Sequence, residues 1–373
     1  MERIYYFDNN GTTQLSKNVS RVMAKVNLYT YGNPSSMHTV GVEAKEIVEN
    51  ARQKVAKLFD KKKDNIIFTS GATESNNAVI HSALYQNEGR KQVIISSIEH
   101  PSVYNCVKHY KMLGYDVIFV PVKETEIDIG YIKENLSHQT AFVSIMAVNN
   151  ETGMILPVEK IFQIVKNYDS NIICHSDCVQ AVGKANIPLK NADYLTISAH
   201  KFHGPKGIGC IYKNDDMRFL PFIWGGNQER GYRSGTENVT GIAGFGEAAE
   251  KVQDILDEKS RLRTYQIKLE KALAAVGGYV VCANSERVSG VTNIGFETID
   301  AHQLLLKLNQ RGIFVSTGSA CSSGDIGVSR VIKAIGVPTK YQSTIRISMS
   351  KYTSEEDVDY LIEQVTEIVK KTL

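Results

Sequence analysis

The sequence predicts an α/β protein in which a large layered domain is joined to a smaller α+β domain. Between residues 66 and 213, short apolar runs rich in Val and Ile alternate with amphipathic stretches, which is typical of an α/β fold. Beyond residue 275 the pattern changes, and strand-like and helical segments alternate again with different spacing. The chain has 373 residues, which suits two domains of about 100–200 residues each.

Seven apolar runs predict the strands of a mostly parallel sheet in the large domain. Each run is apolar on both faces, as expected when helices cover both sides of a parallel sheet. Helices are expected between most of the runs, for example over residues 102–113 and 157–167. The runs cover residues 66–70, 93–96, 117–120, 141–148, 172–175, 194–198 and 208–212.

The second half predicts one long helical stretch, over residues 239–275, and then the smaller domain. Strands are expected over residues 279–282, 290–296 and 344–348, with helices over 302–311 and 329–335. The last helix should begin after Ser354, which with Asp357 forms a capping-box pattern. We expect residues 15–255 to form the large domain, and residues 1–14 with 256–373 to form the small one.

Composition excludes several classes of protein. The chain is 42% hydrophobic and 22% charged, with 43 Lys and Arg against 40 Asp and Glu. A net charge of +3 gives no basic footprint for nucleic acid. No apolar run approaches the ~18 residues of a spanning helix, and residues 1–10 lack the pattern of a signal peptide. We therefore expect a cytoplasmic protein without membrane or direct nucleic-acid partners.

The six cysteines predict neither a disulfide framework nor a metal site. No two of them form a Cys-x-x-Cys pair, and the chain is large for a disulfide scaffold. Cys174 and Cys178 are four residues apart, with His175 and Asp177 between them. Metal-ligand spacing is one interpretation of this segment, but a buried strand containing small apolar cysteines is favoured.

Three segments at expected strand ends could carry chemistry. Lys201 follows one strand and could form a Schiff base with a carbonyl cofactor, although a surface turn is the ordinary interpretation. Thr73 lies where a strand meets a helix that could bind phosphate, or simply be capped. Asp177 could pair with a pyridinium nitrogen or cap the next helix. Together they match the parts that a pyridoxal phosphate site needs.

The chain resembles the cysteine desulfurases of the NifS/IscS group, within the class V aminotransferase family. The motifs that carry the resemblance extend over nearly the whole chain. They are residues 6–13 (YFDNNGTT), 32–36 (GNPSS), 71–75 (GATES), 99–100 (EH), 149–153 (NNETG), 198–207 (SAHKFHGPKG), 233–236 (RSGT), 318–323 (GSACSS) and 345–348 (IRIS). The resemblance implies a PLP-dependent transferase of fold type I, with pyridoxal 5'-phosphate as cofactor.

The resemblance also implies roles for individual residues. Lys201 would carry the cofactor, and His100 would stack on its ring and move protons. Asp177 would pair with the pyridinium nitrogen, and Gln180 would contact the ring hydroxyl. The remaining cofactor-binding residues would be Ala72, Thr73, Asn150, Ser198 and His200, with Thr236 contributed by the partner subunit of a homodimer. Asn150 and Arg346 would hold the substrate carboxylate, with Asn33 and Arg233 as weaker candidates for the same place.

Cys321 decides which reaction the resemblance implies. Its small, permissive neighbours are typical of a loop that moves. As in cysteine desulfurases, its thiolate would take sulfur from L-cysteine, leaving L-alanine and a persulfide. The sulfur would then pass to an acceptor protein, either an iron–sulfur scaffold or a transfer-RNA thiolation enzyme. No resident metal is expected, although Cys321 could serve as a transient iron–sulfur ligand by the same resemblance.

Two alternatives stay open at this point. One is a selenocysteine lyase, or another class V lyase or aminotransferase, although an aminotransferase has no use for Cys321. The other is a sulfur carrier without enzymatic activity, which would require a missing catalytic part. The chain contains Lys201, Asp177, His100, Arg346 and Cys321, so an enzyme is favoured.

Overall fold

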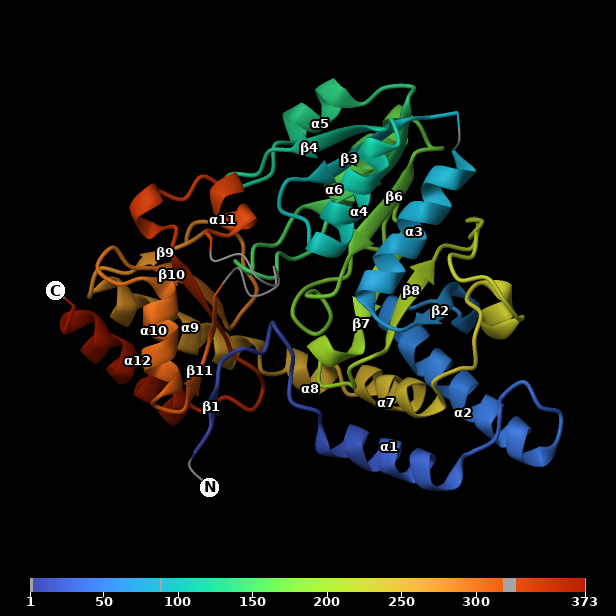
Figure 1. The fold of residues 1–373 in the computed structure, drawn as a ribbon, viewed down its shortest axis with the longest axis horizontal. Helices are drawn as coiled ribbons and strands as arrows, with labels where there is room; N and C mark the ends of the chain where they lie inside the picture. Colours follow the sequence, from blue (N-terminus) through green and yellow to red (C-terminus); the bar gives the residue numbers. More distant parts are fainter. Residues whose placement is uncertain (1–2, 88, 318–326, 373) are drawn as a thin grey trace.

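A computed structural model describes residues 3–87, 89–317 and 327–372. Figure 1 shows a large α/β layer structure beside a smaller group of helices and short strands that contains the C-terminal helix. The helices are α1 (Lys17–Tyr29), α2 (Thr39–Ala56), α3 (Ala72–Gln86), α4 (Pro101–Met112), α5 (Ile129–Asn135), α6 (Val158–Tyr168), α7 (Val239–Glu250), α8 (Gln253–Leu256), α9 (Lys259–Ala274), α10 (Ala301–Asn309), α11 (Arg330–Ala334) and α12 (Glu355–Lys370).

The central sheet has seven strands, as the apolar runs predict. They are β2 (Ile66–Thr69), β3 (Gln92–Ser96), β4 (Asp116–Val120), β5 (Thr140–Ser144), β6 (Ile173–Asp177), β7 (Tyr194–Ser198) and β8 (Gly209–Lys213). Their spatial order is β2-β8-β7-β6-β5-β3-β4. All neighbours are parallel except β8, which is antiparallel to both β2 and β7. β2 therefore runs in the same direction as β6 and β7.

Both faces of the sheet are buried under helices, which explains the continuous apolar runs. In β3, Val93 and Ile95 belong to the apolar cluster that contains residues of α3 and α4, whereas Ile94 belongs to the cluster that contains residues of α2, α6 and α7. Alternate residues of a strand point to opposite faces. A strand covered on both sides must therefore be apolar at successive positions, as the sequence shows.

The smaller region is built on a second, antiparallel sheet. Its strand order is β12-β13-β10-β9, from β12 (Ser316–Thr317), β13 (Thr344–Ser348), β10 (Val291–Gly295) and β9 (Tyr279–Val280). A separate parallel pair joins β1 (Tyr5–Tyr6) near the N-terminus to β11 (Ile313–Phe314). Phe7 packs into the same apolar cluster as residues of α9, α10 and α12. The division at residue 255 stays a prediction.

Two expectations about these elements need correction. The stretch 239–275 is three helices, α7, α8 and α9, rather than one. The run 141–148 is a strand only to Ser144, because Val148 forms a bridge with Ile155 and the chain turns back there. The predicted capping box at Ser354 and Asp357 is confirmed at the start of α12.

Candidate active site

A cavity of about 500 Å³ lies at the carboxyl end of the central sheet. Strands β2, β6 and β7 run in the same direction, so the segments that follow Thr69, Asp177 and Ser198 meet there. Ligands of open α/β sheets bind at this edge. The cavity is lined by nine of the ten cofactor-binding residues that the sequence predicts, Ala72, Thr73, His100, Asn150, Asp177, Gln180, Ser198, His200 and Lys201.

One end of the cavity offers groups that can bind an anion such as a phosphate. Helix α3 begins there, and Gly71 at its N-cap provides no side-chain cap, so the first backbone N–H groups of the helix are available to an anion. Gly71 has φ of 154°, a conformation that other residues rarely adopt. Thr73 and Ser198 line the same cavity with Lys206, a cation that sequence reasoning did not single out.

Asp177 presents a buried carboxylate to the cavity. It is 4% exposed, and its oxygens accept hydrogen bonds from Asn76 Nδ2 at 2.8 Å and from the N–H of Val179 at 3.0 Å. Both donors are neutral, and within the described ranges no lysine or arginine forms an ion pair with it. A buried carboxylate of this kind favours a cationic partner. The protonated nitrogen of a pyridine ring fits that requirement.

A chain of hydrogen bonds fixes the protonation state of His100. Asn76 Nδ2 also donates to Ser102 Oγ at 2.8 Å, so the Ser102 hydroxyl donates to His100 Nδ1, 2.8 Å away. The N–H of Ser102 donates to the same nitrogen. Burial lowers the pKa of His100, against the opposing effect of Asp177. The ring is therefore neutral, with its proton on Nε2, and can stack on a cofactor and donate a hydrogen bond.

Lys201 is oriented by the N-terminal segment of the chain. Its Nζ donates to the carbonyl oxygens of Asn10 and Gly11, at 2.8 and 2.6 Å. Thr13 fixes that segment on the turn after β7, because its N–H and hydroxyl both donate to the His200 carbonyl. The amine thus has two acceptors in the cavity wall.

Asn10 connects most of the polar groups around Lys201, although the sequence did not single it out as a site residue. Its Nδ2 donates to the Asn150 carbonyl at 3.0 Å, and its carbonyl accepts from Gln180 Nε2 at 2.9 Å. Its Oδ1 accepts from Lys184 Nζ at 2.9 Å. The signal available in the sequence was its place in the motif of residues 6–13.

Arg346 approaches the cavity from the second sheet. It lies on β13 and is 3% exposed. Its Nη2 forms an ion pair with Asp8 Oδ1 at 2.6 Å, and its Nη1 donates to the Asn150 carbonyl at 3.3 Å. The buried Nε has no hydrogen-bond partner among the described residues. A guanidinium with an unused donor beside Asn150 can bind a carboxylate.

The structure does not bring every predicted residue to the cavity. Asn33 is exposed and accepts a hydrogen bond from the Ser35 N–H. Arg233 is engaged by Glu74, with 2.9 Å between Nε and Oε1. Thr236 lines a neighbouring cavity of about 250 Å³ that shares Ser70 and Gly207 with the first. Cys321 lies outside the described residues. The roles of these four residues stay predictions, as do the roles of the predicted residues that line the cavity.

One buried carboxyl group and two backbone carbonyls connect the second region to this cavity. Glu151 Oε2 accepts from Ser329 Oγ at 2.6 Å, and burial raises the pKa of Glu151 to about 7. Arg330 donates to the carbonyl oxygens of Ser97 and Glu99, next to His100. The segment that begins α11 is therefore bound to two segments of the cavity wall.

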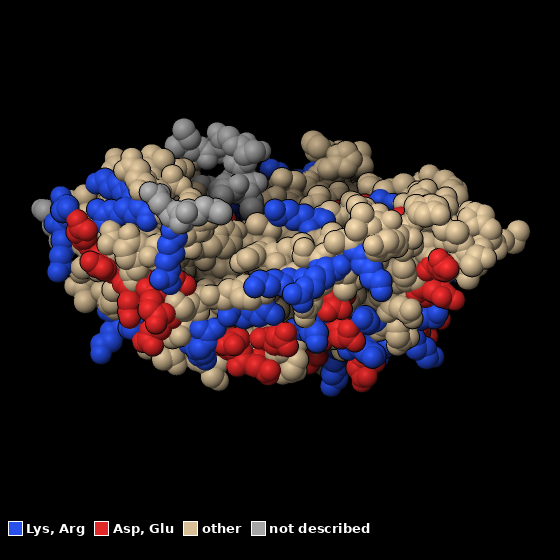
Figure 2. Space-filling model, turned by 90° about the horizontal axis from the view of Figure 1, so that it is seen from below, with Lys and Arg blue, Asp and Glu red and all other residues tan. Residues whose placement is uncertain are grey.

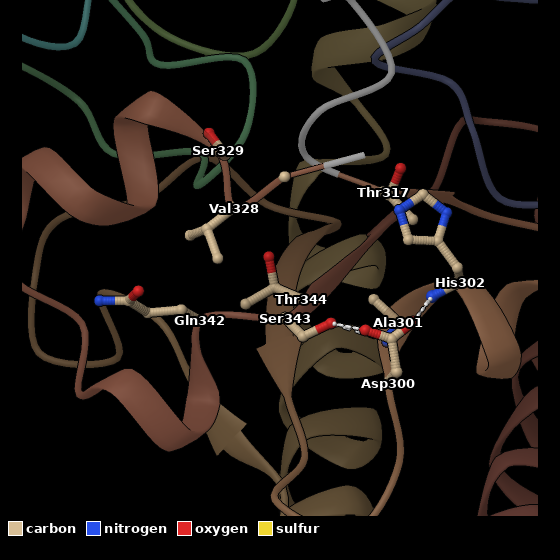
Figure 3. Close-up of a pocket in the computed structure, with 10 residues that line it drawn as sticks. Asp300, Ala301, His302, Thr317, Val328, Ser329, Gln342, Ser343 and Thr344 are labelled. Carbon is tan, nitrogen blue, oxygen red and sulfur yellow. Dashed lines mark hydrogen bonds between the residues drawn. The ribbon is translucent and has the colours of Figure 1, made fainter. Parts of the chain in front are cut away.

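A second cavity of about 200 Å³ offers less chemistry. Figure 3 shows it between the start of α10, residues 342–344 and Ser329, with Ser343 bonded to Asp300. The Asp300 carboxylate also caps α10 through the N–H of His302. Among its described lining residues only Asp300 and His302 could act as bases, and both Asp300 oxygens already accept hydrogen bonds, so we place the function in the larger cavity.

Other features of the described residues concern membranes, metal ions, cysteines and surface charge. No described helix is both long and apolar enough to cross a bilayer. The same residues contain no cluster of His, Cys, Asp and Glu that could hold a metal ion. The five described cysteines are free thiols. Figure 2 shows acidic and basic side chains interspersed on the face that it presents, with no continuous basic surface there.

The sequence and the fold both match known proteins. The class-V aminotransferase pattern matches residues 5–361. A cysteine desulfurase of Nostoc sp. is 41% identical and covers 99% of this chain and 93% of its own length. The cysteine desulfurase NifS of Azotobacter vinelandii is 39% identical, and the match covers 98% of this chain and 92% of NifS. A solved NifS-like protein superposes with a TM-score of 0.93 at 36% identity, covering 99% of this chain and 100% of its own.

Proposed function

The chain belongs to the class-V aminotransferase family, in the cysteine desulfurase group of NifS and IscS, and from this premise we propose that it removes sulfur from L-cysteine to give L-alanine. The family uses pyridoxal 5'-phosphate, and the cavity fits that cofactor. The observation that carries the proposal is the meeting of Lys201, Asp177 and the start of α3 at one cavity. These are the attachment point, the ring-nitrogen partner and the phosphate site.

When bound, the cofactor supplies an electron sink for bonds to the substrate Cα. Thr73, Ser198 and His200 would hold its phosphate, and Asp177 would keep the ring nitrogen protonated. Arg346 and Asn150 orient the substrate carboxylate.

The same arrangement favours Lys201 over His100 as the base that takes the Cα proton. The Nδ1 of His100 accepts from Ser102 and its Nε2 already carries a proton, so the neutral ring has no lone pair to offer the cavity. The amine of Lys201, held by the Asn10 and Gly11 carbonyls, can hold and return the proton once it is neutral.

The sulfur step belongs to Cys321. Its thiolate attacks the substrate sulfur, so that an S–S bond forms and the C–S bond breaks. The electron pair of the broken bond stays with the three-carbon fragment, which gains a proton and leaves as alanine. The persulfide on Cys321 carries the sulfur to an acceptor protein of iron–sulfur assembly or transfer-RNA thiolation. The support for this step is the match of residues 318–323 to the family motif.

We also propose a cytoplasmic homodimer. Four large apolar side chains gather between the end of α1 and the start of α2, Leu28, Tyr29, Tyr31 and Met37, and they are 69–96% exposed. Apolar patches of this kind are typical of subunit interfaces. Thr236 lies outside the cavity of its own chain, which suits a contribution to the partner's site.

Product analysis tests the proposed function. Purified, cofactor-loaded protein is mixed with L-cysteine and a thiol reductant, and alanine and sulfide are assayed. Equal yields of both are expected. Cys321→Ala should abolish sulfide release while leaving the cofactor spectrum unchanged, and Cys106→Ala serves as the matched control that keeps both.

Two other results would redirect the assignment. A spectral change with L-cysteine but no sulfide contradicts desulfuration and turns attention to selenocysteine and other amino acids. Retained wild-type sulfide release in Cys321→Ala overturns the role of that thiol.

A further inference from the structure

Lys184 is a second lysine beside the cavity, and the mechanism above does not use it. It lies in the turns that follow β6, and its side chain is partly buried. Its Nζ donates to Gln180 Oε1 at 2.7 Å and to Asn10 Oδ1 at 2.9 Å. In the part of the chain that the structure describes, it forms no ion pair with a carboxylate. A lysine held only by neutral acceptors keeps its charge uncompensated.

A single asparagine separates the two lysines. The Oδ1 of Asn10 accepts from Lys184, and its backbone carbonyl accepts from Lys201. Gln180 completes the connection, because its Oε1 accepts from Lys184 and its Nε2 donates to the Asn10 carbonyl. The bond from Lys184 therefore also fixes which way the Gln180 amide faces, and Gln180 lines the cavity.

We propose that Lys184 is a positioning residue whose charge, transmitted across Asn10, keeps the Lys201 amine neutral once substrate has displaced it from the cofactor. This proposal rests on the proposed function and deepens it. A free lysine amine has an ordinary pKa of about 10.4 and would be protonated at neutral pH. A neighbouring cation in a site of low dielectric favours the neutral form, which is the form that accepts a proton.

The charges around the pair support this direction. Burial, followed by the charges of Lys201 and Arg346, lowers the pKa of Lys184 to about 7, and such coupling between two sites is reciprocal. Once Lys201 is neutral, its charge no longer lowers the pKa of Lys184, so the proton stays on Lys184. Several titratable groups face the two lysines from the packed elements, namely Asp8, Glu74, His100, Asp177, His200, His203, Lys206, Lys259 and Arg346. Of the three carboxylates, Asp8 is paired with Arg346 and Glu74 with Arg233, and Asp177 would pair with the ring nitrogen.

The test is a pH titration of the absorbance of the cofactor–Lys201 linkage in the loaded enzyme. Lys184→Met is expected to raise the apparent pKa of that linkage by about 1 unit, from the loss of one charge across a few ångströms. The acidic limb of the kcat–pH profile should move in the same direction. Lys184→Arg, which keeps the charge, should restore the wild-type midpoint.

A second variant covers the case in which Lys184→Met does not fold. Asn10→Asp is nearly isosteric and places a negative charge between the two amines, so it should raise the same midpoint. The matched control is Lys213→Met, which removes a buried lysine that donates only to the backbone carbonyls of residues 214, 215 and 217. That change should leave the midpoint unchanged.

Two results would overturn the proposal. One is a titration midpoint that is unchanged in both Lys184→Met and Asn10→Asp. The other is a shift in Lys184→Arg or Lys213→Met as large as that in Lys184→Met. The titration requires only bound cofactor and not sulfur transfer. Failure of the proposed desulfurase activity would leave the titration readable, so the two failures are distinguishable.

Discussion

The cofactor end and the substrate end of the proposed active site are assembled in different ways. At the cofactor end, Asp177, Ser198 and the start of α3 follow strands that run in one direction in one sheet, so strand order alone brings them together. At the substrate end, Arg346 comes from the second sheet and Asn150 from a turn after β5. Asp8 comes from the N-terminal segment, and only long-range bonds place these three.

This difference indicates where each end is vulnerable. The cofactor end depends on the chemistry of single side chains in a rigid frame, because its strands are buried on both faces. The substrate end depends on a few polar contacts between segments that are distant in the chain. Changes at the cofactor end should abolish the reaction and leave the fold intact. Changes at the substrate end should mainly weaken substrate binding.

Asp177→Asn should have the largest effect. Asparagine keeps the shape but cannot hold a protonated ring nitrogen, so kcat should fall about 10³-fold, equivalent to about 4 kcal/mol of transition-state stabilisation. Steady-state kinetics with the cofactor absorbance measures this. The matched control is Asp193→Asn, a buried carboxylate of the same sheet that pairs with Lys166. Asp193→Asn should lower the Tm and leave the cofactor spectrum unchanged. A wild-type kcat in Asp177→Asn would contradict the role assigned to Asp177.

Arg346→Lys tests the substrate end and should have an intermediate effect. Lysine keeps the charge but loses the planar fork that matches a carboxylate, so KM for L-cysteine should rise about 10-fold or more, with a smaller change in kcat. Arg311→Lys is the control, because Arg311 pairs with Glu367 away from the cavity. An unchanged KM in Arg346→Lys would remove this residue from the substrate site.

Glu99→Gln tests a buried carboxyl group beside His100 and should have the smallest effect. Glu99 is fully buried, accepts from Ser96 Oγ and the Met146 N–H, and burial raises its pKa to about 8. The folded protein therefore holds the protonated acid. Its contribution to stability is present below the unfolded pKa of about 4.5 and is lost as pH rises toward 8. The wild type should lose stability across that range.

Thermal unfolding from pH 5 to pH 8 measures this effect. The Tm of Glu99→Gln minus the Tm of the wild type should be about 2 °C larger at pH 8 than at pH 5, because glutamine has no proton to lose. Glu297→Gln, at an exposed ion pair on the surface, should run parallel to the wild type. Parallel curves for Glu99→Gln as well would show that the buried acid does not titrate in this way.

The central sheet was predictable because its physical signal is local. Strands covered on both faces must be apolar at successive positions. Five of the seven runs match strands within one residue at either end, and the run 172–175 matches β6 within two. The exceptions have tertiary causes. The run 141–148 leaves the sheet early because Val148 pairs with Ile155, and the stretch 239–275 divides into three helices.

The sequence by itself determined the chemistry of the cofactor end, because Lys201, Asp177 and Thr73 each follow a strand-like run, and parallel strands end at one edge. The tertiary structure alone decided how those groups are connected. Asn10 meets Lys201 and Lys184, which are more than 170 residues away, and Asn76 links Asp177 to His100 through Ser102. Such bonds depend on where backbone carbonyls and amides lie after folding. No local pattern of residues records that arrangement.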